Sequence, residues 1–525
     1  MARSAQPLGL WAGAAAAALL VCVVFGSLAA VAWRAEGAAR FGPADWAALR
    51  FTLTQASLSA LFSVALAVPV ARALARRRFT GRGVLITLLG APFILPTIVA
   101  VLGLLAVFGR SGILSAALGW AGLEPVRIYG LHGVVLAHVF FNLPLATRLL
   151  LQGWLAVPAE RFRLAAAFGF GPRDVFRHIE WPMLREVVPG AVLVVFLICL
   201  TSFAVALTLG GGPRATTVEL AIYQAFRFDF DLARAALLAL VQFGLCALAA
   251  LVVYRVAAPA AMGGGLDRPV ERHDLQGRGL ALLDGGLIGL AALFLLTPLA
   301  MIVMNGVPGL AGLPGTVWLA AGRSLLVALA ATGLVIAMAL GLALAVVGFE
   351  RAGRRGAGAA LEALGMVALA ASPLVIGTGL FILIFPIADP SALALAVTAL
   401  VNAVMALPFA LRALLPALRG VEADHGRLAD SLGIGGRARL RLVLLPRLRH
   451  PLGFSAGLAA ALSMGDLGVI VLFAGGDAAT LPLQLYRLMG AYRMGDAAGA
   501  ALLLLALSLA LFWAFDRGGR RDARG

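Results

Sequence analysis

Residues 163–182 read RLAAAFGFGPRDVFRHIEWP, and residues 427–446 read RLADSLGIGGRARLRLVLLP. The two segments align without a gap at an offset of 264 residues, and the same offset superposes Arg148 on Arg412 further upstream. Chance rarely produces so many matches in one ungapped register. The sequence therefore predicts that the chain contains an internal repeat centred on these two segments.

The sequence around the two segments is strongly apolar. Of its 525 residues 62% are apolar, and the mean hydropathy is +0.98. A soluble domain contains roughly 45–50% apolar residues, so a soluble enzyme is not expected. Because a helical span needs about 20 apolar residues, we predict an all-α polytopic membrane protein with about twelve transmembrane helices. Apolar runs of spanning length start near Leu8, Phe51, Gly83, Leu131, Val188, Arg234, Leu280, Ser324, Ala359, Leu393, Gly453 and Ala497.

A polar, glycine-rich stretch at 257–279 divides these runs into two sets of six. We predict a first repeat at 1–256, a linker at 257–279 and a second repeat at 280–525. Because six is even, both repeats have the same orientation, and a pseudo-two-fold axis along the membrane normal relates them. The first run also resembles a cleavable signal, but it is longer than a signal core, which favours a retained span.

The charge pattern predicts the topology. The formal net charge is +17, and all 42 basic residues are Arg. With both termini in the cytoplasm, 29 Arg lie on the inner side and 11 on the outer side, as the positive-inside rule requires. This reading needs no nucleic-acid partner. The absence of Lys excludes a standard P-loop ATPase site, and Cys22, Cys199 and Cys246 suggest neither a disulfide framework nor a metal site.

The repeated segments predict a helix–turn–helix in each cytoplasmic loop, 153–187 and 417–452. A small Ala permits close helix contact, a Gly ends the helix in a left-handed conformation, and a Pro limits the next helix to starting around it. Two such loops form a docking site for a two-fold partner, whereas ordinary punctuated loops are the alternative. The residues are Ala165, Gly169, Ile179 and Pro182, and Ala429, Gly433, Val443 and Pro446.

This spacing resembles the EAA loop of ABC importer permeases, although Arg163 and Arg427 stand where that family has Glu. The resemblance implies the type I importer permease fold in a bacterial inner membrane, with no cofactor and no catalysis of its own. It also implies two copies of a separate ATPase subunit docked on the loops, a periplasmic binding protein, and alternating access driven by ATP.

Three stretches, 137–144, 209–224 and 231–236, are similar to thiamine and thiamine pyrophosphate permeases. That resemblance implies transport of thiamine or its phosphates. A ferric-iron permease is the alternative, because that branch also fuses its two halves. An ion-coupled secondary transporter is a further alternative, but it would not need the duplicated loops.

Polar residues within the spans are candidates for a translocation path. Asp466 lies in the eleventh run, the 264-residue offset pairs it with Ser202, and Asn142 lies in the fourth run. Hydrogen bonds that fasten neighbouring helices are the alternative for each.

Two outer loops carry candidate contacts to the binding protein. The polar segment 210–223 contains Gly211, Arg214 and Thr217, and its counterpart contains Thr480. Simple connectors are the alternative.

Overall fold

The computed structural model describes residues 9–36, 41–90, 94–256, 278–475 and 478–520, and within these ranges every regular element is a helix. The predicted linker, apart from its last two residues, lies outside them. The helices before it are α1 (Leu10–Ala35), α2 (Pro43–Arg76), α3 (Arg82–Leu88), α4 (Thr97–Phe108), α5 (Ile113–Trp120), α6 (Leu131–Ala156), α7 (Ala159–Ala167), α8 (Pro172–Val175), α9 (Trp181–Leu200), α10 (Phe203–Leu209), α11 (Val218–Arg227) and α12 (Leu232–Val256).

The helices after the linker follow the same order. They are α13 (Arg278–Leu310), α14 (Gly315–Arg351), α15 (Arg355–Met366), α16 (Pro373–Ile384), α17 (Ala394–Ser431), α18 (Gly436–Arg439), α19 (Leu445–Met464), α20 (Ile470–Phe473), α21 (Leu481–Gly490) and α22 (Met494–Arg520). Single turns complete the list: η2 (Phe176–Glu180) and η5 (Leu440–Leu444) are π-helical, and η3 (Pro213–Ala215) and η4 (Val367–Ala370) are 3₁₀.

The described residues contain ten helices that are long and apolar enough to cross a membrane, or eleven if the bent pair α15–η4 and α16 is one span. The sequence predicts about twelve. The missing one is α19, which occupies the place of α9 in the second half. Arg447, Arg449 and His450 lie in its first turns and make it too polar to qualify by composition.

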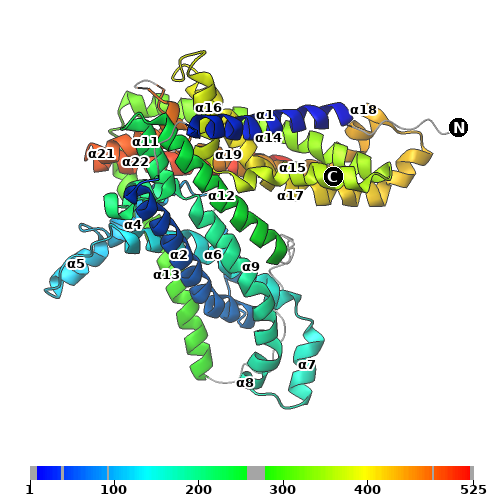
Figure 1. The fold of residues 1–525 in the computed structure, drawn as a ribbon. Coiled ribbons are helices and arrows are strands. Elements are labelled where there is room, and N and C mark those ends of the chain that lie inside the picture. Colours follow the sequence, from blue (N-terminus) through cyan, green and yellow to red (C-terminus); the bar gives the residue numbers. More distant parts are fainter. Residues whose placement is uncertain (1–8, 37–40, 91–93, 257–277, 476–477, 521–525) are drawn as a thin grey trace.

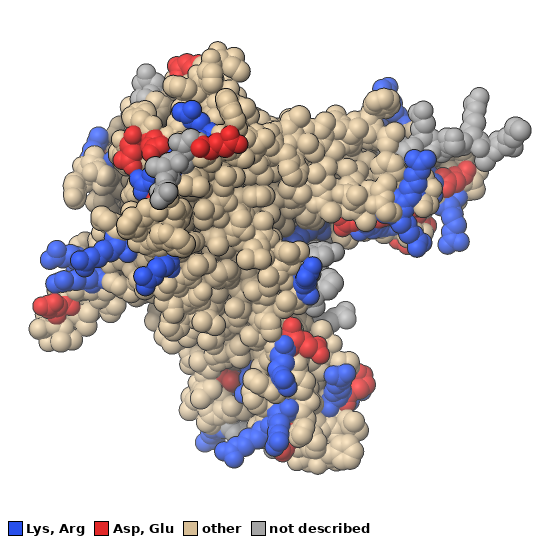
Figure 2. All heavy atoms as spheres, viewed as in Figure 1, with Lys and Arg blue, Asp and Glu red and all other residues tan. Residues whose placement is uncertain are grey.

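Figure 1 shows two arms that diverge from a common body. Helices α7 and α8 lie at the tip of one arm, and α18 lies at the tip of the other. Figure 2 shows charged side chains gathered at both tips, while the surface between them is mostly uncharged. The uncharged shafts are suited to the membrane and the charged tips to water.

Within each arm the main packing is the same. Helix α2 packs against α6 and α9, and α14 packs against α17 and α19. The Thr52 hydroxyl of α2 accepts a hydrogen bond from the Val218 amide at 2.9 Å, and the Ser324 hydroxyl of α14 accepts one from the Leu481 amide at 2.8 Å. These bonds attach α11 to α2 and α21 to α14 in equivalent ways.

The first helix of each half packs against the other half. Helix α1 lies along α14 and α16, and α13 lies along α2 and α4. Small residues allow the first contact, because a Cβ placed on Gly13 would lie only 2.4 Å from the Cβ of Ala345. The second contact includes an ion pair at 2.7 Å between Arg77 and Asp284, whose side chain is almost fully buried. Each arm is therefore built from two separate stretches of the chain.

Candidate functional site

The first loop (153–187) contains a turn that ends α7. Gly169 has a φ of 69°, and its amide donates to the Ala166 carbonyl at 3.0 Å. The next amide, that of Phe170, donates to the Ala165 carbonyl at 2.9 Å. This pair of bonds is the Schellman motif, which needs a left-handed residue and therefore favours Gly. Ala165 is buried in the hairpin.

The second loop (417–452) repeats this turn. Gly433 has a φ of 66° and donates to the Asp430 carbonyl at 3.1 Å, while Ile434 donates to the Ala429 carbonyl at 2.9 Å. Ala429 is buried like its counterpart. The prediction that a helix ends near each Gly is confirmed, and both small Ala side chains are buried.

The prediction for the two prolines needs a correction. The helix that contains Pro182 begins at Pro172, and the one that contains Pro446 begins at Gly436, ten residues earlier in each case. A π-helical turn, η2 or η5, precedes each Pro. Because Pro lacks an N–H and its ring clashes with the preceding turn, a widened turn lets the helix continue. Ile179 and Val443 lie within these turns and are half-buried.

A small apolar cluster holds the first loop together. Its buried members are Val157, Phe162, Ala165 and Val175, and Ile179 packs against them. An ion pair then fastens the loop to α2. The fully buried Glu180 carboxylate accepts hydrogen bonds from the Arg72 guanidinium at 2.7 Å and from the Trp154 indole at 3.1 Å.

An ionic network holds the second loop together. The buried Arg439 guanidinium donates to Glu422 at 2.5 and 3.0 Å, to Asp430 at 2.5 Å and to the Gly426 carbonyl at 3.3 Å. Arg351, at the end of α14, forms further ion pairs with Glu422 at 3.5 Å and with Asp430 at 2.7 Å. The network therefore joins α17, α18 and α14.

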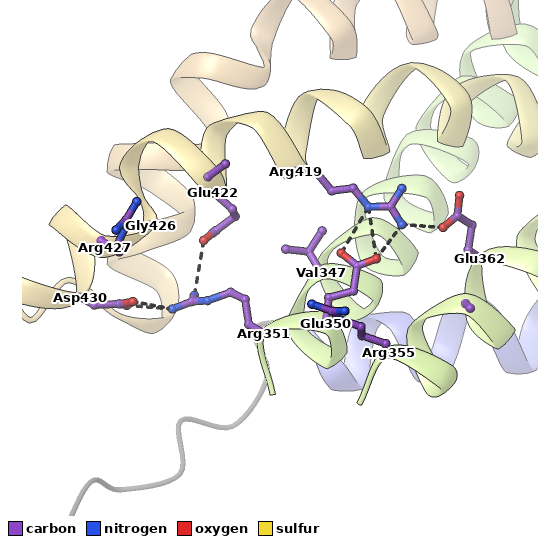
Figure 3. A pocket seen from close by; sticks show the side chains of 12 residues that line it. Val347, Glu350, Arg351, Arg355, Glu362, Arg419, Glu422, Gly426, Arg427 and Asp430 are labelled. Atoms are coloured by element: carbon purple, nitrogen blue, oxygen red, sulfur yellow. Dashed lines mark hydrogen bonds and ion pairs between the residues drawn. The ribbon is translucent and has the colours of Figure 1, made fainter. Parts of the chain in front are cut away.

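A cleft of about 620 Å³ lies between α14, α15 and α17 beside this network (Figure 3). On its far side Arg419 lies between Glu350 and Glu362, at 2.6 Å from each. The acids on the cleft wall are thus already paired with Arg351, Arg419 or Arg439. Arg355 and Arg427 also line the cleft, and neither forms an ion pair within the described residues.

Sequence reasoning missed Glu180 and Arg439. Both lie inside the repeated segment, but their partners come from elsewhere: Arg72 is 108 residues from Glu180, and Glu422 is 17 residues from Arg439. One signal was present in the alignment. At the 264-residue offset Arg439 replaces Val175, and a cation in an apolar position requires a buried acid.

The candidate path residues fall into two groups. Ser202 follows the end of α9, and its hydroxyl lies 2.7 Å from His138 Nε2. The Asn142 amide donates to the His138 carbonyl at 2.9 Å, so Asn142 and Ser202 meet at His138 in the first half. Asp466 belongs to the second half, where its carboxylate accepts from the Gly468 amide at 3.1 Å.

The placement of Asp466 within a continuous span is wrong. Helix α19 ends at Met464, and α20 begins at Ile470. Asp466 lies in this break, as Ser202 lies in the break between α9 and α10. Gly465 and Gly468 flank Asp466 and contribute little helix propensity. Gly465 packs against Pro96 of the first half, so the break lies where the two halves meet.

Of the four candidate contacts to the binding protein, two are exposed and two are buried. Gly211 and Arg214 are exposed, and Gly211, with φ at 75°, packs against Tyr129. Thr217 and Thr480 are buried at the N-terminal ends of α11 and α21, and the Thr217 hydroxyl accepts from the Leu220 amide at 3.2 Å. Both occupy N-cap positions, although only the Thr217 side chain forms a capping bond. Because both are buried, a docked protein would not contact them in this conformation.

Comparison with known proteins identifies the family. Permeases named thiamine transport system permease protein ThiP are similar over nearly the whole chain: 41% identity in Brucella abortus (98% of this chain, 96% of that protein), 42% in Salmonella typhimurium (91% and 90%) and 40% in Escherichia coli (100% and 100%). The chain belongs to this permease family. No family model matches the sequence.

The molybdenum transport system permease protein ModB of Azotobacter vinelandii is 30% identical over 34% of this chain and 78% of its own length. The permease thus has the all-α fold of ABC importer permeases and is a multi-pass inner-membrane protein. Among its described residues no three His, Cys, Asp or Glu side chains are grouped as metal ligands would be.

Proposed function

We propose that the permease moves thiamine or a thiamine phosphate from the periplasm to the cytoplasm as the membrane subunit of an ABC importer. The observation that supports this most is the similarity of nearly the whole chain to permeases named for thiamine transport. The relatives that match over nearly the whole chain are named for thiamine transport, so the iron alternative is not favoured.

We propose further that the two loops transmit ATP-driven motion. They lie at the tips of separate arms (Figure 1). Each loop contains the same Schellman turn, and the helix after it begins at an equivalent position. Two equal sites suit two copies of one ATPase, and with no Lys in the chain the standard P-loop must come from that partner. The contacting residues would be the exposed Arg163, Gly169 and Pro182, and Arg427, Gly433 and Pro446. The buried Ala165 and Ala429 and the half-buried Ile179 and Val443 would instead hold each loop in shape.

The same proposal places both loops and both termini in the cytoplasm and treats 1–256 and 280–525 as two parallel repeats. Helix α1 starts beside the last turns of α14, since a Cβ on Gly9 would lie 2.7 Å from the Leu344 Cβ. Helix α22 ends beside the start of α19, where a Cβ on Gly519 would lie 2.6 Å from the Arg449 carbonyl. Both contacts are on the side of the molecule that carries the second loop.

An inward-facing state is the best description of this conformation. The arms are apart at the loop ends, and α11 and α16 lie at the opposite end (Figure 1). Aromatic rings join the two halves there. Phe226 of α11 and Phe381 of α16 pack edge to face at 4.3 Å, and Phe381 also contacts Phe473 of α20. A substrate delivered by the periplasmic binding protein, near the exposed Gly211 and Arg214, would enter when these contacts open and pass the breaks at Ser202 and Asp466.

Uptake of labelled thiamine tests this function. Cells that require thiamine would express the permease with its ATPase and binding protein, and each component would be omitted in turn. We expect uptake only when all three are present. Iron uptake in place of thiamine uptake would change the substrate, and uptake without the ATPase would favour an ion-coupled secondary transporter.

A further inference from the structure

Each loop displays three arginines at matching positions, which we call the arginine triads. The first triad is Arg163, Arg173 and Arg177, and the second is Arg427, Arg437 and Arg441. All six are exposed. Within each triad the last two are four residues apart on a helical segment, which places them on one face. The same cationic surface is thus built twice.

These cations are nearly unpaired. In the part of the chain that the structure describes, Arg163 has one ion pair, with Glu160 at 3.9 Å, and both side chains are about 70% exposed. Such a pair contributes little. The other five triad members form no ion pair there. On the second loop Glu422 and Asp430 bind Arg351 and Arg439, and the exposed Asp424 forms no ion pair with Arg427 within the described residues.

The positions of the triads favour a protein partner over lipid. The 20 residues from Trp181 to Leu200, which continue the helix begun at Pro172, are long enough to span the hydrocarbon core. Arg173 lies eight residues before Trp181, or about 12 Å along a helix, and Arg163 lies on the far side of the Gly169 turn. The attraction of an anionic bilayer decays within a Debye length of about 8–10 Å. Arg177 lies only four residues, or about 6 Å, before Trp181 and is within this reach, whereas Arg173 lies at its edge. A bilayer could therefore hold Arg177 but not the whole triad, which favours a protein partner.

We propose, on the basis of the docking proposed above, that the ATPase presents a carboxylate-lined groove to each loop, and that the arginine triads bind these carboxylates. Two copies of one subunit carry identical grooves, which explains why both loops keep the same three arginines.

Co-purification of the ATPase with the permease in detergent, over a range of salt concentrations, tests this. One variant would carry Arg→Gln at all six triad positions. The control would carry Arg255→Gln and Arg354→Gln, which remove one exposed arginine from each arm outside the loops. We expect the wild-type affinity to fall steeply with salt, and the triad variant to bind about 100-fold more weakly at low salt with a flat salt dependence. The control should behave as wild type.

Changes on the ATPase would show whether the triads act through direct contact with its carboxylates. Carboxylates of the ATPase that crosslink to the triads would be changed to Gln, and this should weaken wild-type binding but not weaken the triad variant further. A triad variant that binds with wild-type affinity and salt dependence would overturn the inference and leave docking intact. Failure of the wild-type permease to retain any ATPase would overturn the docking itself. If only anionic lipid restored binding, the triads would be lipid contacts and the inference would be wrong.

Discussion

In the first loop Val175 packs with Phe162 inside a small apolar cluster, whereas the matching position in the second loop is Arg439, which binds two acids. The backbones of the two loops turn at the same places. Their interiors, however, are stabilised by different forces. A helix hairpin of this shape can therefore be filled either by apolar contact or by an ionic network.

Two other substitutions make this exchange feasible. Gly426 stands where the first loop has Phe162, and the space that it leaves is taken by the Arg439 guanidinium, 3.1 Å from where a Cβ would lie. Glu422 stands where the first loop has Pro158. Because Pro158 interrupts the chain between α6 and α7 and Glu422 does not, α17 runs unbroken from Ala394 to Ser431 and carries an acid to Arg439.

Disrupting the Schellman turn that both loops contain should have the largest effect on transport. Val at Gly169 and Gly433 together must adopt φ near 69° and 66°, which costs a β-branched residue roughly 1–3 kcal/mol at each site. We expect uptake to be lost while ATP hydrolysis and membrane insertion continue. Labelled thiamine uptake, ATPase assays and membrane fractionation measure the three.

Gly171→Ala with Gly435→Ala is the matched control, because both residues have negative φ. A Cβ would meet only an ordinary contact with Asp174 at Gly171 and nothing at Gly435. This control should transport normally. Normal uptake in the Val variant would mean that the shared turn is not needed for coupling.

The second largest effect should appear in the second loop but not in the first. Arg439→Met leaves the mostly buried Glu422 with only the 3.5 Å contact to Arg351. Removing one partner from a buried pair costs about 3 kcal/mol, so we expect hydrogen exchange to accelerate in 432–446 but not in 168–182. Arg437→Met, at an exposed neighbour, should change neither segment. Equal protection in both variants would show that the network does not hold the second loop.

Salt should have the smallest effect, and again on one loop only. The Arg351–Asp430 pair is 40% and 54% exposed, so raising salt from about 0.05 to 0.5 M should weaken the second loop by about 0.5 kcal/mol. The first loop rests on apolar contacts and the fully buried Glu180, and its exchange should not change. Identical salt responses in the two segments would contradict the difference between their interiors.

The sequence predicts those structural features that depend on neighbouring residues in the chain. The offset of 264 residues located both loops, and the glycines marked the ends of their helices because a left-handed residue is needed there. Ala165 and Ala429 were predicted to lie in close contacts, and both are buried.

What the sequence did not predict depends on packing between distant segments. Nothing near Glu180 indicates that it meets Arg72, and nothing in α19 indicates that Arg447 and Arg449 are tolerated at the start of a helix within the bundle. Thr217 and Thr480 looked like surface residues because they follow polar loops, but each starts a helix that packs inward. A polar residue beside a loop does not reveal which way it faces.

The crossed packing of the first helices has a consequence for biosynthesis. Helix α1 is synthesised first, yet α14 and α16, which form much of its packing surface, are completed only when residue 384 has been made. At about 5–20 residues per second, roughly 20 to 70 seconds pass before that surface exists. Until then α1 can pack against α12 but not against the other arm, so a nascent chain halted at the linker would leave a groove on α2 and α4 where α13 belongs. The bundle can be closed only after translation has passed well beyond its midpoint.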